Sequence, residues 1–177
     1  MHPCLFSTEH SFATVHEEYN AVWIDTDAAG DLYFHGKGAG GMPAASAVVS
    51  DLADLCRWIL SRAPAPAFGS NTGPAPIKAM AAARLSFYIR LWARDRPGVL
   101  AKIAGILAGH GLSIAQIFQG SVKGFEARRG EAPVILLTHP GSEGAMQKAL
   151  SALRRQGTSR VASFLRVEPS MAPGRTS

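Results

Sequence analysis

The segment at residues 95–119, DRPGVLAKIAGILAGHGLSIAQIFQ, constrains the fold of this chain more than any other. Residues 85–92, just before it, alternate between aliphatic or Phe side chains and other residues, which is the period of a β-strand. Inside the segment, four apolar residues share one helical face: Val99, Ile103, Ile106 and Leu107. Glycines on both sides of His110 favour a helix end there. The pattern therefore predicts a strand, a turn, a short helix and a second strand.

The turn before this helix is the first candidate for a binding site. Pro97 fixes a helical φ and lacks an N–H that the first helical turn leaves unpaired anyway. Asp95 is predicted to accept a hydrogen bond from the free N–H groups of that turn. Gly98 has no Cβ, so a ligand can approach its backbone closely. The turn is predicted to combine a helix cap with exposed backbone donors.

The rest of residues 83–168 completes an α+β domain. Residues 133–138 and 161–167 have the length and composition of strands. Ser142 is a candidate N-cap, and Glu143 follows it in the first helical turn. Four residues are predicted to form the buried face of that helix: Met146, Ala149, Leu150 and Leu153. The order βαββαβ predicts a ferredoxin-like fold, with two helices on one face of an antiparallel four-stranded sheet.

The opposite face of this sheet is predicted to be an association surface. Phe87, Ile89 and Phe164 are too many large side chains for all of them to face the helices, so some are expected on the open face. An exposed apolar face of this kind is typical of an interface. We expect a homodimer with two-fold symmetry through residues 85–168.

Residues 1–62 predict a different structure, the end of a larger α/β domain. Two strands at residues 20–25 and 31–34 flank a turn, which indicates a hairpin. A glycine-rich loop at residues 36–41 leads into a helix that Pro43 opens. This helix carries a strong apolar stripe: Ala45, Val48, Val49, Leu52, Leu55, Cys56 and Ile59. Nothing in residues 1–62 is large enough to bury that stripe, so the partner surface is expected to belong to the larger domain.

Composition assigns the remaining regions and excludes some classes of function. Residues 63–82 are rich in Pro, Ala and Gly and predict a linker, and residues 169–177 predict a disordered tail. The net charge of +5 comes from scattered basic residues, which does not favour nucleic-acid binding. No apolar run is long enough for a membrane span, and the first residues do not resemble a signal peptide. Two cysteines make no disulfide framework, so the expected compartment is the cytoplasm.

Other polar residues favour structural roles over chemical ones. Six histidines show no metal-ligand spacing, so no metal site is predicted. His110 is expected to cap its helix, with bordering the ligand site as the less favoured alternative. Lys37 and Lys123 are expected to be solvated, and the Lys123-Gly124-Phe125 stretch lacks the rest of an RNA-recognition signature. Three acidic residues are expected to stabilise the hairpin turn rather than to act as acids or bases: Asp25, Asp27 and Asp31.

The DRPGVL and HGLSI motifs, with a short helix between them, resemble those of ACT domains, which bind amino acids and regulate metabolic enzymes. The resemblance covers residues 85–168. It implies that the ligand lies between two domains, with the turn and helix start of one domain facing the second strand of its neighbour. Carried over to this sequence, the effector-binding residues are Asp95, Gly98, Val99 and Leu100, together with Ser113, Ile114 and Gln116 from the facing strand.

A second resemblance lies within residues 18–57, in YNAVWIDTDAAGDLYFHGKGAGGMPAASAVVSDLADLCR. This stretch is similar to the end of the catalytic region of homoserine dehydrogenases, which join such a segment to a C-terminal ACT domain. The resemblance implies that the glycine-rich loop lies beside the NAD(P) cofactor and substrate, at Gly38, Ala39 and Gly40. From its residues alone, the loop is equally consistent with a tight structural turn.

Together the resemblances imply a C-terminal part of an NAD(P)-dependent enzyme that interconverts aspartate semialdehyde and homoserine, in threonine and methionine synthesis. The catalytic lysine and aspartate of that family and its dinucleotide-binding loop have no counterpart in this sequence, so no catalytic residue is assigned. The chain alone is expected to be inactive and to bind no cofactor. The ACT domain implies feedback regulation by an amino acid, with threonine expected as the pathway's end product. The alternative is a stand-alone amino-acid-binding module without catalysis.

Overall fold

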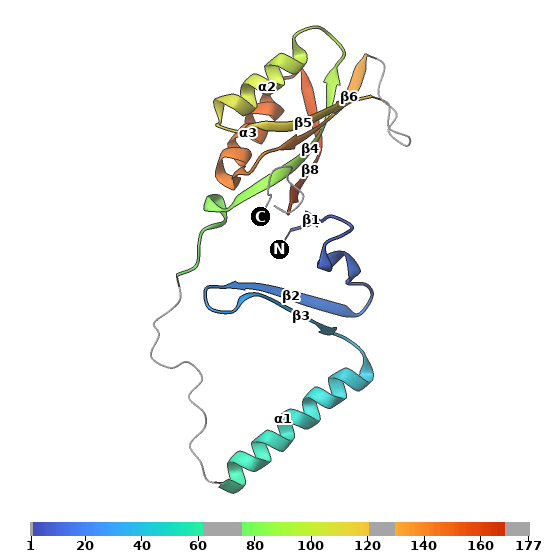
Figure 1. Ribbon diagram of the computed structural model, residues 1–177. Coiled ribbons are helices and arrows are strands. Elements are labelled where there is room, and N and C mark those ends of the chain that lie inside the picture. The colour runs from blue at the N-terminus through green and yellow to red at the C-terminus, as the bar shows by residue number, and fades with distance from the viewer. Residues whose placement is uncertain (1, 62–75, 121–129, 169–177) are drawn as a thin grey trace. The chain divides into compact units, whose positions relative to one another are not determined.

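The computed structural model describes residues 2–61, 76–120 and 130–168 (Figure 1). The chain divides into two compact units, Met1–Thr8 with Ile77–Ser177, and Glu9–Pro76. Residues 1–8 thus group with the unit that contains residues 83–168, although the sequence placed them in the first domain. Three predictions lie outside the described residues: most of the linker, the C-terminal tail and the Lys123-Gly124-Phe125 stretch.

The larger unit has the predicted α+β fold. Its elements follow the order βαββαβ: β4 (Arg84–Arg94), α2 (Val99–Gly109), β5 (Ile114–Gln119), β6 (Glu131–Thr138), α3 (Glu143–Arg155) and β8 (Ser159–Val167). The four strands lie in the order β8-β4-β6-β5, and every neighbouring pair among them is antiparallel. The prediction of a ferredoxin-like fold is confirmed.

Helices α2 and α3 cover one face of this sheet, and the core lies between the two layers (Figure 1). The four residues predicted to form the buried face of α3 are all in this core: Met146, Ala149, Leu150 and Leu153. Phe87 and Ile89 are fully buried in the same core, and Phe164 packs against it with its ring 5.7 Å from that of Phe87. The expectation that these three side chains divide between the faces is therefore wrong. The open face instead carries the alternate residues of β4, which are half-buried: Tyr88, Arg90 and Trp92.

Local signals in the sequence explain where the two helices begin and end. Helix α2 ends in a Schellman motif, in which the N–H groups of Gly111 and Leu112 donate to the carbonyls of Ala108 and Leu107. Gly111 has φ +71°, a conformation that favours glycine. At the start of α3, the Ser142 hydroxyl accepts a hydrogen bond from the N–H of Ala145 at 3.2 Å, as an N-cap should.

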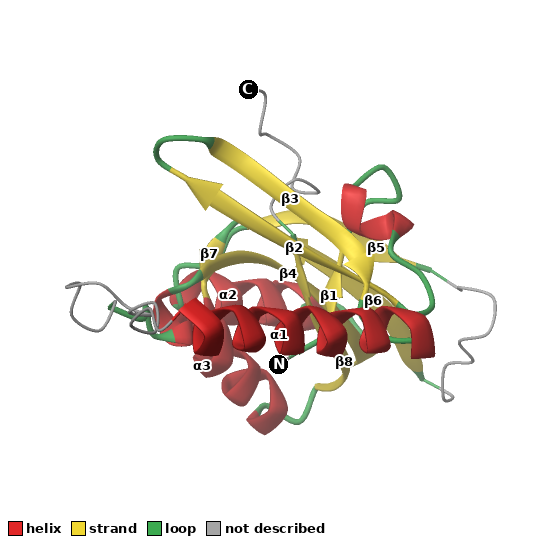
Figure 2. Cartoon of the chain, turned by 90° about the horizontal axis from the view of Figure 1, so that it is seen from below, coloured by secondary structure: helices red, strands yellow, loops and turns green. Residues whose placement is uncertain are grey.

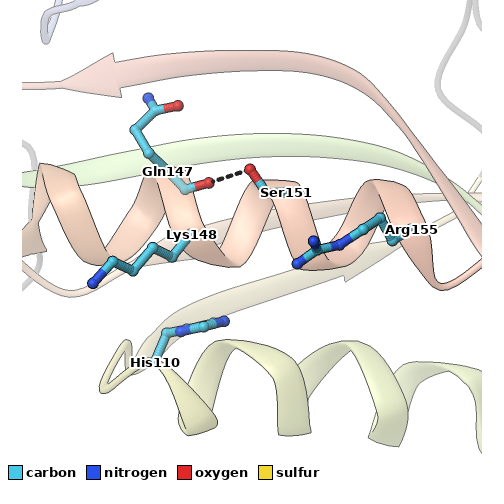
Figure 3. A pocket seen from close by; sticks show the side chains of 5 residues that line it. All are labelled: His110, Gln147, Lys148, Ser151 and Arg155. Carbon is cyan, nitrogen blue, oxygen red and sulfur yellow. Dashed lines mark hydrogen bonds between the residues drawn. The ribbon is translucent and has the colours of Figure 1, made fainter.

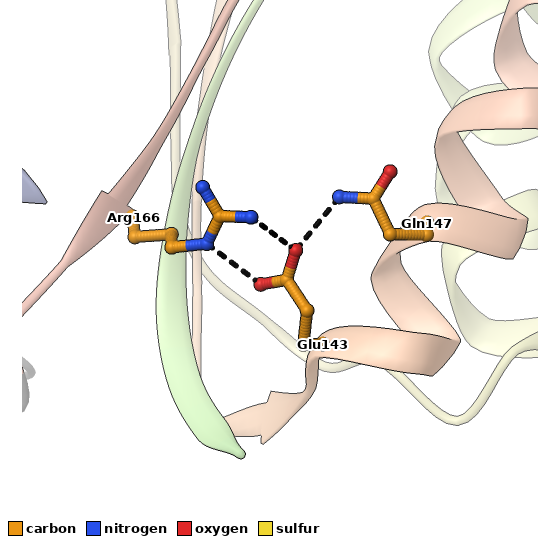
Figure 4. Close-up of polar contacts among 3 residues, drawn as sticks. All are labelled: Glu143, Gln147 and Arg166. Carbon is orange, nitrogen blue, oxygen red and sulfur yellow. Dashed lines mark hydrogen bonds and ion pairs between the residues drawn. The ribbon is translucent and has the colours of Figure 1, made fainter. Parts of the chain in front are cut away.

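A buried ion pair fastens the start of α3 to β8 (Figure 4). Arg166 donates from Nε to Glu143 Oε2 at 2.9 Å and from Nη2 to Oε1 at 2.5 Å, and Gln147 Nε2 also donates to Oε1. Only 5% of the Glu143 side chain is exposed, so its charge depends on these partners. Burial raises the pKa of Glu143, but the hydrogen bonds from Arg166 and Gln147 outweigh burial and leave this pKa below its ordinary value.

Short elements complete the larger unit. β1 (Cys4–Leu5) pairs in parallel with β8, β7 (Gly141–Ser142) pairs with β4, and a 3-10 turn η2 spans Met80–Ala82. The sheet therefore has six strands, with β1 outside β8 and β5 at the other edge.

The smaller unit contains the 3-10 turn η1 (Ser11–Thr14), the hairpin of β2 (Tyr19–Thr26) and β3 (Gly30–Lys37), and the helix α1 (Gly41–Ser61) (Figure 2). The predicted hairpin is confirmed, and its turn is closed by the Thr26 hydroxyl, which donates to the carbonyl of Gly30 and accepts from the N–H of Ala29.

No residue between 9 and 61 is buried. The apolar stripe of α1 lies open to solvent, with Val49 64% and Ile59 75% exposed. No helix in the described part of the chain is long and apolar enough to cross a membrane.

Candidate functional site

A hollow of about 170 Å³ lies where β4 passes into α2. Ten residues line it: Ala93, Arg94, Asp95, Arg96, Pro97, Gly98, Val99, Leu100, Gln119 and Val134. Four of the predicted effector-binding residues are among them: Asp95, Gly98, Val99 and Leu100. The hollow joins the turn, the start of α2, the end of β5 and the middle of β6 in one place.

The turn that borders this hollow is of type II. The N–H of Val99 donates to the carbonyl of Arg96 at 3.4 Å, with Pro97 and Gly98 between them. Gly98 has φ +83° and ψ −12°, the values of the third residue of a type II turn, which normally requires glycine. A Cβ at Gly98 would meet no atom within 4 Å. Glycine is therefore needed here for its backbone angles, and the space beside it is open to a ligand.

Backbone donors at the start of α2 lie beside the hollow, and donors of this kind suit an anion. The first intrahelical bond runs from the N–H of Lys102 to the carbonyl of Gly98 at 3.0 Å. The N–H groups of Leu100 and Ala101 therefore have no intrahelical partner, and the positive end of the helix dipole lies beside them. Two cationic residues, Arg94 and Arg96, are also among the lining residues. A carboxylate is the group that this combination suits.

Asp95 does not cap α2, which corrects the prediction from the sequence. The N-cap position belongs to Gly98, and no side chain caps the helix. The type II turn delays the helix start to Val99, which leaves Asp95 in the preceding loop. Its N–H donates to the carbonyl of Gly130 at 3.0 Å, and the residue is exposed and lines the hollow. Asp95 is therefore available to pair with a cation in the hollow.

The other three predicted residues lie elsewhere in the same chain. Ile114 and Gln116 belong to β5, the edge strand, and Ser113 precedes it. None of the three lines the hollow, so their action across to a neighbouring domain stays a prediction. Gln119, the last residue of β5, does line it and was not predicted. Its position at the far end of the second strand depends on the β5–β6 register, for which the sequence carries no signal.

His110 lies at the C-cap of α2, as predicted, and does not border the first hollow. It lines a second, larger hollow of about 380 Å³ between the end of α2 and the outer side of α3 (Figure 3). The other lining residues all come from α3: Gln147, Lys148, Ser151 and Arg155. The Ser151 hydroxyl donates to the carbonyl of Gln147, and the Gln147 amide is engaged by Glu143.

The glycine-rich loop lies between β3 and α1. The N–H of Gly38 donates to the carbonyl of Glu18 at 2.8 Å, and a Cβ at Gly38 would collide with the side-chain amide of Asn20. Gly40 has φ +118°, which only glycine adopts readily. Lys37 pairs with Glu18 at 2.8 Å, and this hydrogen bond lowers the pKa of the Glu18 carboxyl. Lys37 therefore has an ion-pair partner in the same unit.

Acidic and histidine side chains of the smaller unit also have hydrogen-bond partners that give them structural roles. Asp31 accepts a hydrogen bond from the indole of Trp23 at 3.2 Å, and Asp25 and Asp31 face each other across the hairpin. His10 accepts from the N–H of Phe12 at the start of η1. Within the described residues, no three metal-ligating side chains gather at one point.

Two family models match separate parts of the chain. The homoserine dehydrogenase family model matches residues 1–53, and the ACT domain model matches residues 87–155. The homoserine dehydrogenase of Pseudomonas aeruginosa is 37% identical over 174 residues, covering 95% of this chain and 39% of its own length. The homoserine dehydrogenase of Corynebacterium glutamicum is 32% identical over 156 residues, covering 87% of this chain and 33% of its own length. The crystal structure of a homoserine dehydrogenase from Thiobacillus denitrificans matches with a TM-score of 0.77 at 35% identity, covering 94% of this chain and 38% of that one.

These matches confirm both resemblances predicted from the sequence. The chain is related to homoserine dehydrogenases and carries an ACT domain. It spans 39% of the length of the Pseudomonas aeruginosa relative.

Proposed function

We propose that this chain forms the regulatory end of an NAD(P)-dependent homoserine dehydrogenase, which interconverts aspartate semialdehyde and homoserine in threonine and methionine synthesis in the cytoplasm. Two observations support the proposal: the order of the two matched families along the chain, and the hollow at the turn between Arg96 and Val99. The hollow carries the proposal, because it offers an ACT domain the chemistry to hold an amino acid.

An amino acid fits this hollow as a zwitterion. Its carboxylate would accept hydrogen bonds from the free N–H groups at the start of α2, beside Arg94 and Arg96. Its ammonium group would pair with the Asp95 carboxylate on the same rim. Threonine is the proposed effector because it is the end product of the pathway, so that its binding would provide feedback.

The smaller unit is proposed to pack against the rest of the dehydrogenase domain. The stripe on α1 exposes large apolar side chains, such as Val48, Leu52 and Leu55, about half to the solvent. An apolar stripe of this length is stable only when another surface covers it. In that setting Gly38, Ala39 and Gly40, between β3 and the start of α1, are proposed to border the NAD(P) cofactor.

The 177-residue chain alone is expected to show no dehydrogenase turnover. In the described residues the only parallel strand pairing is the short one between β1 and β8, so no doubly wound nucleotide-binding sheet is present. The measurement is an assay of the purified chain with homoserine and either NAD or NADP. Turnover on the order of 1–10³ s⁻¹, the ordinary range for enzymes, would contradict this expectation.

The ACT domains are proposed to form a homodimer through the β5 edge. β1 covers the β8 edge of the sheet, whereas among the described residues no strand pairs with the outer side of β5, which exposes Ile117 and Phe118 by 44% and 55%. An exposed apolar edge strand is a template for pairing with a second copy. Such a pairing would bring the partner's Ser113, Ile114 and Gln116 towards the hollow, as the ACT resemblance implies.

The dimer is tested by sedimentation at tens of micromolar protein. The wild-type chain is expected to sediment as a dimer, and Phe118→Lys as a monomer, because a charge on the edge strand disfavours edge-to-edge pairing. Ile77→Lys is the matched control, since Ile77 is 95% exposed and lies outside the sheet. A wild-type monomer, with and without threonine, would count against the proposed interface.

A stand-alone amino-acid sensor is the second candidate function. It is favoured by one observation: every buried residue of the described chain lies in the ACT unit, which therefore has a complete core of its own. A free sensor is expected to stay well dispersed at high concentration, whereas the exposed stripe of α1 is expected to drive association. Light scattering of the purified chain, compared with a Val49→Lys, Leu52→Lys double variant, separates the two candidates.

A further inference from the structure

The strand β1 belongs to the segment that matches homoserine dehydrogenases, but it pairs with a strand of the ACT sheet. Cys4 and Leu5 lie within residues 1–53, which match the homoserine dehydrogenase family, yet they pair with Arg166 and Val167 of the ACT sheet. The N–H of Glu168 donates to the carbonyl of Leu5 at 3.0 Å and extends this ladder. The dehydrogenase-type segment thus supplies the outer strand of the regulatory sheet.

The same end of β8 carries the ion pair that fastens α3. Arg166, opposite Cys4 in the β1–β8 register, sends its side chain to Glu143, the first residue of α3 (Figure 4). The residue that pairs with Cys4 of β1 therefore also holds the start of α3 in place.

The opposite end of β8 is bonded to the loop that borders the proposed effector site. The N–H of Arg94, a residue of the hollow, donates to the carbonyl of Thr158 at 3.0 Å, just before β8 begins. Between these ends β8 pairs with β4 from Ser159 to Val167. One strand thus contacts the rim of the hollow at its start and β1 at its end.

We propose that the pairing of β1 with β8 couples effector binding in the ACT domain to the dehydrogenase segment. A ladder of two residue pairs is short enough to open locally while the rest of the sheet stays folded, which gives a paired and a released state. An effector that orders the Arg94–Thr158 contact holds β8 in place and favours the paired state. Because coupling between two sites is reciprocal, release of β1 weakens effector binding by the same factor. The inference rests on the proposed function of the hollow.

Proline substitution in the full chain tests this coupling. Leu5→Pro removes a strand N–H and disfavours the ladder. Thr8→Pro is the matched control, because Thr8 lies in the turn that follows β1 and is outside the β1–β8 ladder. Leu5→Gly, which keeps the N–H but weakens the strand, is a second variant with a smaller expected effect. Circular dichroism establishes that each variant is folded.

Two readouts are taken for each variant: calorimetric titration with threonine, and hydrogen exchange of the Glu168 amide with and without threonine. The expected result is binding at least about fivefold weaker in Leu5→Pro, unchanged binding in Thr8→Pro, and slower exchange at Glu168 when threonine is bound to the wild type. Equal binding by Leu5→Pro and the wild type, or exchange at Glu168 that threonine leaves unchanged, overturns the coupling alone. Absence of amino-acid binding to the wild type overturns the proposed effector site and the coupling with it.

Discussion

Glu143→Gln is expected to destabilise the ACT domain by about 3–5 kcal/mol, because it leaves the guanidinium of Arg166 largely buried without a counter-charge. Gln has the same shape as Glu, so the substitution isolates the charge from the packing. The free energy of unfolding is measured by urea denaturation. Lys148→Gln is the matched control on the exposed side of the same helix, where a change within about 0.5 kcal/mol is expected. Equal stability of the two variants would contradict a stabilising role for the pair.

The same ion pair predicts how stability depends on pH. The folded-state pKa of Glu143 is lowered, so the pair contributes fully above the ordinary pKa of glutamate, about 4.3. The contribution is lost as the pH falls below that value and through the lowered folded-state pKa. The wild-type chain should therefore lose more stability than Glu143→Gln over this acidic range. Parallel stability curves for the two proteins would show that Glu143 is not the titrating group.

Gly98→Val is expected to abolish threonine binding. A branched side chain at this position projects into the open space beside the helix start, where the carboxylate of the effector is proposed to lie. The left-handed φ of Gly98 also makes any Cβ unfavourable by about 1–2 kcal/mol, so some loss of stability accompanies the loss of binding. Gly109→Val is the matched control, since Gly109 ends the same helix and has no neighbour within 4 Å of an added Cβ. Calorimetric titration should show binding by the control and none by Gly98→Val.

Asp95→Ala separates loss of binding from loss of stability at the same turn. The Asp95 side chain caps no helix and is exposed, so its removal is expected to change the free energy of unfolding by no more than about 0.5 kcal/mol. Threonine binding should nevertheless weaken, because the partner of its ammonium group is lost. A stability loss as large as that of a lost N-cap, with binding unchanged, would assign Asp95 a structural role instead.

The fold of the ACT domain was predictable because its signals are local. The type II turn needs Pro97 and Gly98 next to each other, the Schellman motif needs Gly111, and the cap of α3 needs Ser142, and each of these lies within a few residues of the element it defines. The buried face of α3 follows in the same way from helical spacing.

The errors in prediction have their origin in register and in long-range contacts. Pro97 was interpreted as the first residue of α2, a position that proline also favours, whereas it belongs to a type II turn that moves the start of α2 past Asp95. Phe87 and Phe164 stack on one face because the β4–β8 pairing aligns them, and that alignment is fixed only when both strands are in the sheet. β1 has two residues and thus no periodicity, and its partner strand lies at the other end of the chain. Gln119 reaches the hollow by the same kind of strand register.

The most direct test of the proposed effector site is calorimetric titration of the wild-type chain with threonine, combined with amide shifts measured by nuclear magnetic resonance. The structure predicts saturable binding, with the largest shifts at residues 94–100 and at Gln119, and no binding by Gly98→Val. Other amino acids serve as competitors that establish the preference for threonine. Shifts confined to other residues, equal binding by Gly98→Val, or no binding of any amino acid would contradict an effector site at the turn between Arg96 and Val99.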